Sequence, residues 1–127
     1  MKHQSTNEVP ESFTHYLAAW NEKDITKIRG HFERSCAENV LFVDPTATTS
    51  NIDELTAFAK QVRTERPNAT NKRISGVDGH NLRYRYLWEI YDDEKLLLAG
   101  MDVTTINEEG KIVQIDGFYG PFPKLDQ

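Results

Sequence analysis

The feature that most constrains the fold of this chain is a change in hydrophobic spacing at Pro67. Before this proline, apolar residues recur at intervals of three and four, which is the spacing of one helix face. After it, apolar and polar residues alternate, as they do on the two faces of a β-strand. A chain of 127 residues that starts with helices and ends with hairpin-linked strands is expected to form one α+β domain, spanning residues 1–127.

Three helices and one strand are predicted before Pro67. Asp24 and Asn51 are candidate N-caps for the second and third helices, and a β-rich run at residues 39–43 lies between these helices. Because proline lacks an N–H group, this strand is expected to end at Asp44, directly before Pro45. The predicted core faces of the three helices are Phe13, Tyr16, Leu17 and Trp20; Ile25, Ile28 and Phe32; and Ile52, Leu55, Phe58, Ala59 and Val62.

Four further strands are predicted after Pro67, joined by short turns. Their ranges are 71–77, 82–91, 95–106 and 111–119, with turn signals at 78–79, 92–94 and 107–110. The order ααβαββββ predicts a mixed or antiparallel sheet, because hairpins pair strands in opposite directions. Three helices packed on the open side of such a sheet, if it is strongly curved, form a cone that encloses a pocket. Residues 1–10 are polar and are expected to form a flexible tail.

Composition and charge exclude several classes of function. The net charge is −5 and no Lys/Arg run is longer than two residues, so nucleic acid is not an expected partner. No apolar segment is long enough to cross a membrane, and the N-terminus does not resemble a signal peptide. The single cysteine, Cys36, indicates a reducing compartment, and we expect the protein to be cytoplasmic. His15, His31 and His80 lack metal-ligand spacing, and no metal or other cofactor is expected.

Four short motifs occur in the same order as in a known superfamily. They are Tyr16–Asp24 (YLAAWNEKD), Phe42–Pro45 (FVDP), Ala99–Asp102 (AGMD) and Asn107–Ile112 (NEEGKI). With the predicted elements between them, they resemble the NTF2-like superfamily, on the side that contains ketosteroid isomerases and SnoaL-like polyketide cyclases. The resemblance covers about residues 12–120 and implies the cone-shaped α+β fold.

The resemblance to ketosteroid isomerase implies three catalytic residues. A tyrosine on the first helix, an aspartate before a proline and an aspartate on the fourth strand correspond to Tyr16, Asp44 and Asp102. In that family one aspartate is the general base, while the tyrosine and a protonated aspartate donate hydrogen bonds to the enolate oxygen. Asp44 would then be the base, with Tyr16 and Asp102 as donors. In SnoaL-type cyclases the fourth-strand aspartate is itself the acid/base, so the alternative is Asp102 as proton carrier and Asp44 as a structural residue.

Asp102 is also unusual on physical grounds, because it lies between Met101 and Val103 in an apolar strand. Burying a carboxylate without a partner is costly. Asp102 is therefore expected either to face solvent or to serve a pocket, where desolvation would raise its pKa and favour the neutral acid. Asp44 lies at a strand end beside a polar loop, where it either stays ionised as a base or caps the turn through its side chain.

The predicted ligand site is mostly aromatic. In the resembled family, the face of the strand that carries Tyr84, Tyr86 and Trp88 lines the cavity, so a flat and partly polar ligand is expected. Trp20 and Trp88 are bulky, which favours a ligand smaller than a steroid. The predicted ligand-binding residues are Trp20, His31, Phe42, Tyr84, Tyr86, Trp88, Gly100, Ile115, Gly117 and Tyr119.

Two classes of function follow from these features. The first is a cofactor-free isomerase or cyclase that performs enolisation chemistry on a small hydrophobic ketone. A related dehydratase would need a histidine beside a carboxylate, which singles out His31. An epoxide hydrolase would need an Asp-Arg-Asp cluster, and no arginine suited to such a cluster is expected on the cavity face. The second class is a non-catalytic module that binds a small hydrophobic or aromatic molecule or forms a homodimer. Its dimer surface would be the outer sheet face, with Arg83, Arg85, Leu87 and Glu89.

Overall fold

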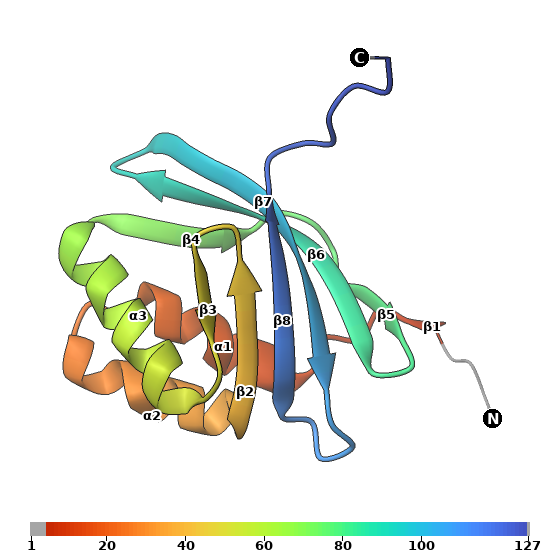
Figure 1. Cartoon of the computed structure of the whole chain (residues 1–127), viewed down its shortest axis with the longest axis horizontal. Helices are drawn as coiled ribbons and strands as arrows, with labels where there is room; N and C mark the ends of the chain where they lie inside the picture. The colour runs from red at the N-terminus through yellow and green to blue at the C-terminus, as the bar shows by residue number, and fades with distance from the viewer. Residues whose placement is uncertain (1–4, 127) are drawn as a thin grey trace.

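Three α-helices lie on one side of a curved, eight-stranded sheet (Figure 1). The structure, a computed structural model, describes residues 5–126. The helices are α1 (Glu11–Asn21), α2 (Ile28–Ser35) and α3 (Ile52–Glu65), and a short 3-10 helix, η1 (Ile25–Lys27), precedes α2. The strands are β1 (Ser5–Thr6), β2 (Cys36–Asp44), β3 (Ala47–Thr49), β4 (Ala69–Arg73), β5 (Asp78–His80), β6 (Arg83–Asp92), β7 (Lys95–Ile106) and β8 (Ile112–Tyr119). The predicted α+β class is confirmed.

The sheet is mixed, because one of its strand pairs is parallel. The strand order is β1-β5-β6-β7-β8-β2-β3, and β4 also pairs with β6. Strands β2 and β8 run parallel, whereas the other paired strands are antiparallel. The first residues of β6 pair with β5 and its last residues pair with β4, so β4 and β5 share one edge of β6. The long β6–β7 hairpin therefore lies at the centre of the sheet.

The first hairpin turn lies further along the chain than predicted. Asp78 and Gly79, the predicted turn, belong to β5. The chain instead turns at Asn81 and Leu82, whose φ angles of 50° and 68° are in the left-handed region. A two-residue type I′ turn needs this region at both positions. Leucine does not favour it, so Leu82 is no turn signal in the sequence.

The predicted strand at residues 71–77 is interrupted. β4 ends at Arg73, and residues 74–77 lie in no strand before β5 begins. The Leu87 N–H donates to the hydroxyl oxygen of Ser75 at 2.8 Å. The Ser75 side chain therefore replaces the backbone carbonyl that would otherwise accept this hydrogen bond from β6. Hydrophobic spacing alone does not predict such a replacement.

The predicted flexible tail, residues 1–10, is only partly described. Residues 1–4 lie outside the described part of the chain, and Ser5–Thr6 forms β1, which pairs antiparallel with β5. Pro10 directly precedes α1, and its carbonyl accepts a hydrogen bond from the Phe13 N–H at 3.0 Å. The chain from Ser5 onward is thus connected to the sheet before the first helix begins.

Most residues of the predicted helix faces pack in or against the core between the helices and the sheet, but Ile25 of η1 is 40% exposed and lies outside it. Helix α3 begins at the predicted cap, where Asn51 Oδ1 accepts from the Glu54 N–H and Glu54 Oε1 accepts from the Ser50 N–H, each at 2.8 Å. The large, fully buried side chains come from α2, α3, β2 and β8 and include Phe32, Ile28, Leu55, Val40, Ile112 and Ile115. Packing of the helices against the inner sheet face therefore buries the core.

A buried arginine joins the end of α3 to the end of α1 and the start of β4. Arg63 is 3% exposed, and its guanidinium donates to the backbone carbonyls of Glu22, Pro67 and Ala69 at 3.1, 3.0 and 2.6 Å. These carbonyl dipoles stabilise a cation that water does not reach. The junction fixes the position at which β4 enters the sheet.

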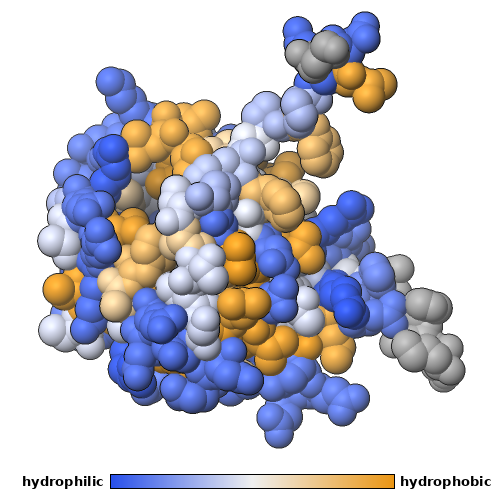
Figure 2. Space-filling model, viewed as in Figure 1, coloured by the Kyte–Doolittle hydropathy of each residue, from blue (hydrophilic) through white to orange (hydrophobic). Residues whose placement is uncertain are grey.

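The outer face of the sheet, away from the helices, carries exposed apolar side chains. Figure 2 shows apolar side chains over the central strands, with hydrophilic side chains around them. Leu87 and Phe118 are 46% and 56% exposed. Homodimer formation through this face stays a prediction.

Among the helices of residues 5–126, none has the length and apolar character needed to cross a membrane.

Replacing Arg63 with Met is expected to lower the free energy of unfolding by roughly 3 kcal/mol, because three carbonyl groups lose a charged donor. Urea unfolding followed by circular dichroism measures the change. Arg66→Met is the matched control, since Arg66 directly follows α3 and forms an exposed ion pair with Asp92. The free energy of unfolding of Arg66→Met is expected to fall by less than about 1 kcal/mol. Equal losses in the two variants would contradict the structural role of Arg63.

Candidate functional site

A cavity of about 610 Å³ lies between the helices and the inner face of the sheet. The three predicted catalytic residues, Tyr16, Asp44 and Asp102, all line it. They come from α1, from the end of β2 and from the middle of β7. Six of the predicted ligand-binding residues also line the cavity, namely Trp20, Phe42, Tyr86, Trp88, Gly117 and Tyr119. Residues that are distant in the sequence therefore converge on one site.

Three other predicted ligand-binding residues lie behind the cavity lining. The Tyr84 ring packs edge-on against Phe13, with the ring centroids 5.4 Å apart. Ile115 is fully buried in the core. Gly100 lies beneath the Trp88 ring. These residues support the cavity wall and do not face its interior.

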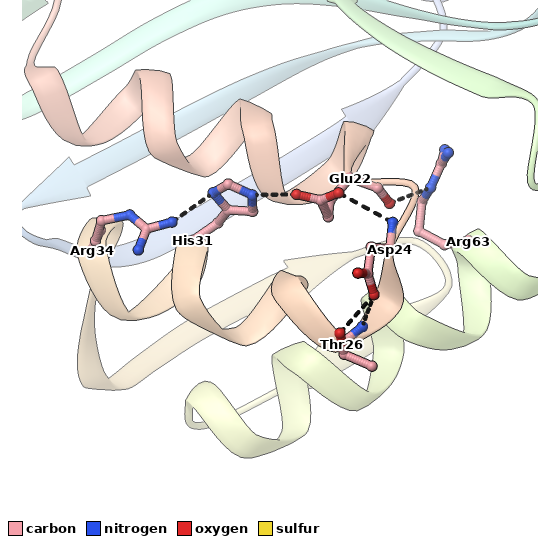
Figure 3. Close-up of polar contacts among 6 residues, drawn as sticks. All are labelled: Glu22, Asp24, Thr26, His31, Arg34 and Arg63. Carbon is pink, nitrogen blue, oxygen red and sulfur yellow. Dashed lines mark hydrogen bonds and ion pairs between the residues drawn. The ribbon is translucent and has the colours of Figure 1, made fainter.

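His31 does not line the cavity, and it contacts Glu22 and Arg34 instead (Figure 3). Its Nε2 lies 2.8 Å from Glu22 Oε1, and its Nδ1 lies 3.0 Å from an Arg34 guanidinium nitrogen. Because a guanidinium only donates, Nδ1 accepts and Nε2 carries the proton that is donated to Glu22. The histidine–carboxylate pair expected of a dehydratase is therefore present, but neither residue lines the cavity.

The register between β6 and β7 determines the surroundings of Asp102. Tyr86 lies opposite Asp102, and Trp88 lies opposite Gly100. The Tyr86 hydroxyl donates to Asp102 Oδ2 at 3.2 Å, and the Trp88 Nε1–H donates to Asp102 Oδ1 at 2.9 Å. Each carboxyl oxygen thus has a donor from β6, and the two hydrogen bonds orient the carboxyl group at the cavity wall.

Gly100 allows the Trp88 ring to occupy this position. A Cβ atom at residue 100 would lie 2.4 Å from a carbon of the Trp88 ring and 2.2 Å from the Phe118 carbonyl oxygen. Any side chain there would displace the indole or the neighbouring strand, because non-bonded atoms do not approach so closely. Gly100 therefore contributes to the site through Trp88, which it positions against Asp102.

Burial raises the pKa of Asp102 from 3.8 to about 6. Hydrogen bonds from Trp88 and Tyr86 oppose this rise because they stabilise the charged form, whereas the carboxylates of Asp44 and Asp116 add to it. Burial also raises the pKa of Tyr16 and of Tyr86 far above the usual range of tyrosine, so both hydroxyls stay protonated. The site thus contains one carboxyl that changes protonation near neutral pH and two neutral hydroxyls.

Asp44 is held by hydrogen bonds in the turn between β2 and β3. Its Oδ1 accepts from the Thr46 N–H, the Thr46 hydroxyl and the Ala47 N–H at 2.8, 3.0 and 2.9 Å. Its Oδ2 accepts from the Tyr119 hydroxyl at 3.1 Å. This turn brings Ala47–Thr49 back along β2 as β3, where a loop was predicted. With four donors already bound, Asp44 has the geometry of a structural carboxylate beside the site.

Gly117 keeps space open between the two aspartates. It lies opposite Asp102 in the β7–β8 pair. A Cβ atom at residue 117 would lie 3.1 Å from Asp102 Oδ1 and 3.3 Å from the Cβ of Asp44. A larger residue would crowd the Asp102 carboxyl on the side that faces Asp44.

Aromatic rings close the apolar end of the cavity. The Trp20 ring lies 5.8, 5.8 and 5.9 Å, between centroids, from the rings of Phe32, Phe42 and Phe58. The lining thus combines packed aromatic rings with the Asp102 carboxyl, which suits a flat, largely hydrophobic molecule that carries polar groups.

The sequence analysis missed three arginines in the cavity lining, namely Arg63, Arg66 and Arg73. Arginines thus do lie on the cavity face, although none was expected there that would suit an Asp-Arg-Asp cluster. The signal for Arg73 was the alternation along β4, since Ala69 and Asn71 share its face and also line the cavity. Across residues 5–126, no ion pair joins an arginine to Asp44 or Asp102, so the Asp-Arg-Asp cluster of an epoxide hydrolase is not formed.

Comparison with known proteins agrees with this architecture. A family model described as a SnoaL-like domain matches residues 13–115. A solved structure from Agrobacterium tumefaciens, a proposed isomerase of the SnoaL-like family, is 30% identical to this chain with a TM-score of 0.80. The match covers 87% of this chain and 95% of that chain. The chain belongs to the SnoaL-like family. No curated protein matches it.

More distant solved structures share the fold. An NTF2-like protein of unknown function from Cytophaga hutchinsonii is 13% identical with a TM-score of 0.66, over 95% of this chain and 96% of that chain. A proposed polyketide cyclase from Sinorhizobium meliloti is 13% identical with a TM-score of 0.67, over 86% of this chain and 94% of that chain. The predicted membership of the NTF2-like superfamily is confirmed.

Replacing Trp88 with Phe is expected to raise the pKa of Asp102 above about 6, because the charged carboxyl loses the indole N–H donor. A carbon-13 NMR titration of the aspartate carboxyl signals measures this pKa. Trp20→Phe is the matched control, since the Trp20 indole also lines the cavity but donates no hydrogen bond to Asp102. A lower or unchanged pKa in Trp88→Phe would show that the indole does not stabilise the charged form.

Proposed function

We propose that this protein is a cofactor-free isomerase or cyclase that moves protons on a small hydrophobic ketone, with Asp102 as the proton carrier. The observation that carries the proposal is the Asp102 carboxyl itself. It lies on the wall of a largely apolar cavity, is oriented by Tyr86 and Trp88, and has a pKa of about 6. A general acid/base is most effective when its pKa lies near the working pH.

In the proposed reaction, ionised Asp102 removes a proton from the carbon beside the substrate carbonyl. The C–H electron pair moves toward the carbonyl and forms an enolate, while the proton forms an O–H bond on the Asp102 carboxyl. In an isomerisation the neutral acid then returns this proton to another carbon. In a cyclisation the enolate carbon attacks a second carbonyl of the same molecule, and Asp102 gives its proton to the alkoxide oxygen that forms there. Tyr16 lines the cavity, and its hydroxyl, which stays protonated, is the proposed hydrogen-bond donor to the enolate oxygen.

The roles of the two aspartates follow from their partners. Asp44 accepts three hydrogen bonds within its own turn and a fourth from the Tyr119 hydroxyl. Asp102 is the carboxyl whose pKa is raised toward neutrality. Of the two schemes considered from the sequence, the geometry thus favours Asp102 as acid/base and Asp44 as a positioning residue. The proposed isomerase at 30% identity supports an isomerase-type reaction for this chain as well.

Asp102→Asn is expected to reduce enzyme-dependent exchange of the α-protons of 2-tetralone in D₂O by at least about 100-fold, since an amide is not a general base. Proton NMR follows the exchange against a protein-free blank. Asp44→Asn is the matched variant and is expected to cost less, because its carboxylate acts on the turn. In the wild type the rate is expected to increase as the pH rises through about 6, since Asp102 must lose its proton to act as a base. Unchanged exchange in Asp102→Asn would remove the proposal.

A non-catalytic binding or dimerisation module is the second candidate. The exposed Leu87 and Phe118 on the outer sheet face support a homodimer in this case. The same assay separates the two candidates, because a module would bind 2-tetralone without accelerating its exchange. In either case we propose action in the cytoplasm, since the chain has a single cysteine, which is buried.

A further inference from the structure

Two of the three arginines in the cavity lining are already bound by protein groups, and the third is Arg73. Arg66 forms an ion pair with Asp92 at 3.1 Å, and the Arg63 guanidinium donates to three backbone carbonyls. Arg73 forms no ion pair within the described part of the chain. A half-buried guanidinium without a carboxylate partner retains free donors for an anionic ligand.

Arg73 lies at the end of a strand, between the cavity and a neighbouring cleft. It is the last residue of β4, directly before the segment that leaves the sheet, and it pairs with Trp88 on β6. Its side chain lines both the cavity and a neighbouring cleft of about 650 Å³. The two spaces share only Arg73 and Tyr86 among their lining residues, so Arg73 lies where they meet.

Tyr86 connects Arg73 to the proposed proton carrier. The guanidinium carbon lies 5.9 Å from the centroid of the Tyr86 ring, and the hydroxyl of the same ring donates to Asp102. Stacking on an aromatic ring restricts the orientation of a guanidinium while its N–H groups remain available. A ligand held by Arg73 would therefore lie along Tyr86, within reach of Asp102.

We propose that Arg73 binds a carboxylate of the substrate, so that the substrate is a ketone that also carries a carboxylic acid. This inference rests on the proposed function and names its substrate class. A guanidinium presents two parallel N–H donors, which match the two oxygens of a carboxylate. A single negative charge fits the site better than a phosphate dianion, because Asp44, Asp102 and Glu65 also line the cavity and would repel the second charge.

The test compares two probes of the same shape, 3-phenylpropanoate and the neutral 3-phenylpropanamide. Binding is measured at pH 7.5 by titration followed with nitrogen-15 NMR, in which the backbone signal of Arg73 and the indole signals of Trp20 and Trp88 report on the cavity. The acid is expected to bind about tenfold more tightly than the amide, and this ratio is expected to fall as the salt concentration rises. Equal affinities, or no binding of the acid, would overturn the inference.

Three variants assign the preference for the acid to one side chain. Arg73→Gln is expected to remove the roughly tenfold preference while leaving the affinity for the amide unchanged. Arg73→Lys is expected to retain only part of the preference, because an ammonium cannot bind a carboxylate through two parallel donors. Arg66→Gln, which removes a cavity arginine already paired with Asp92, is expected to keep it. An undiminished preference in Arg73→Gln would place the anion elsewhere and contradict the proposal.

The same titration in Asp102→Asn separates this inference from the proposed function. A variant that loses the exchange reaction but keeps the preference for the acid supports both. If the wild type shows the preference but no exchange of 2-tetralone, the carboxylate site stands and the catalytic proposal fails. If exchange occurs while acid and amide bind equally, only the substrate inference fails.

Discussion

The pairing of β6 with β7 is the interaction on which both the fold and the site depend. It joins β8, β2 and β3 on one side of the sheet to β4, β5 and β1 on the other. Its register places Tyr86 opposite Asp102 and Trp88 opposite Gly100. Because side chains alternate along a strand, a slip of one residue would turn both aromatic donors to the outer face. Asp102 would then be left on the cavity wall without the donors that make its burial tolerable. The same β6–β7 register is therefore needed both for a stable fold and for the proposed site.

Much of the fold could be predicted from the sequence, because hydrophobic spacing encodes it directly. The three helices, the order of the long strands and the cap at Asn51 all follow from local patterns. The missed details depend on interactions between segments. Ser75 supplies a hydrogen-bond partner to Leu87, and Leu82 adopts a left-handed conformation that its residue type does not favour. Neither feature has a periodic signature, so spacing could not reveal it.

The sequence predicted which residues line the candidate site better than it predicted what each of them does. Asp102 could be singled out because a carboxylate in an apolar strand demands an explanation, and the structure places it in the cavity lining. For Asp44, the local pattern left two roles open, a base or a side-chain cap of the following turn, and the hydrogen bonds from the Thr46 and Ala47 N–H groups agree with the cap. His31 occurs beside a carboxylate, but the rotation of α2 places the pair outside the cavity lining. Arg73 could have been found from strand alternation, because the predicted strand at residues 71–77 already placed it on one face with Asn71.

The position of the two tryptophans has a consequence for how this protein can be observed. Trp20 and Trp88 are the only tryptophans in the chain, and both line the cavity. The emission of an indole depends on the polarity and hydrogen bonding around it, and the Trp88 indole donates to Asp102. All tryptophan fluorescence of the native protein therefore originates beside the cavity. The emission of the unlabelled protein is therefore expected to change when a ligand enters the cavity and when Asp102 gains or loses its proton.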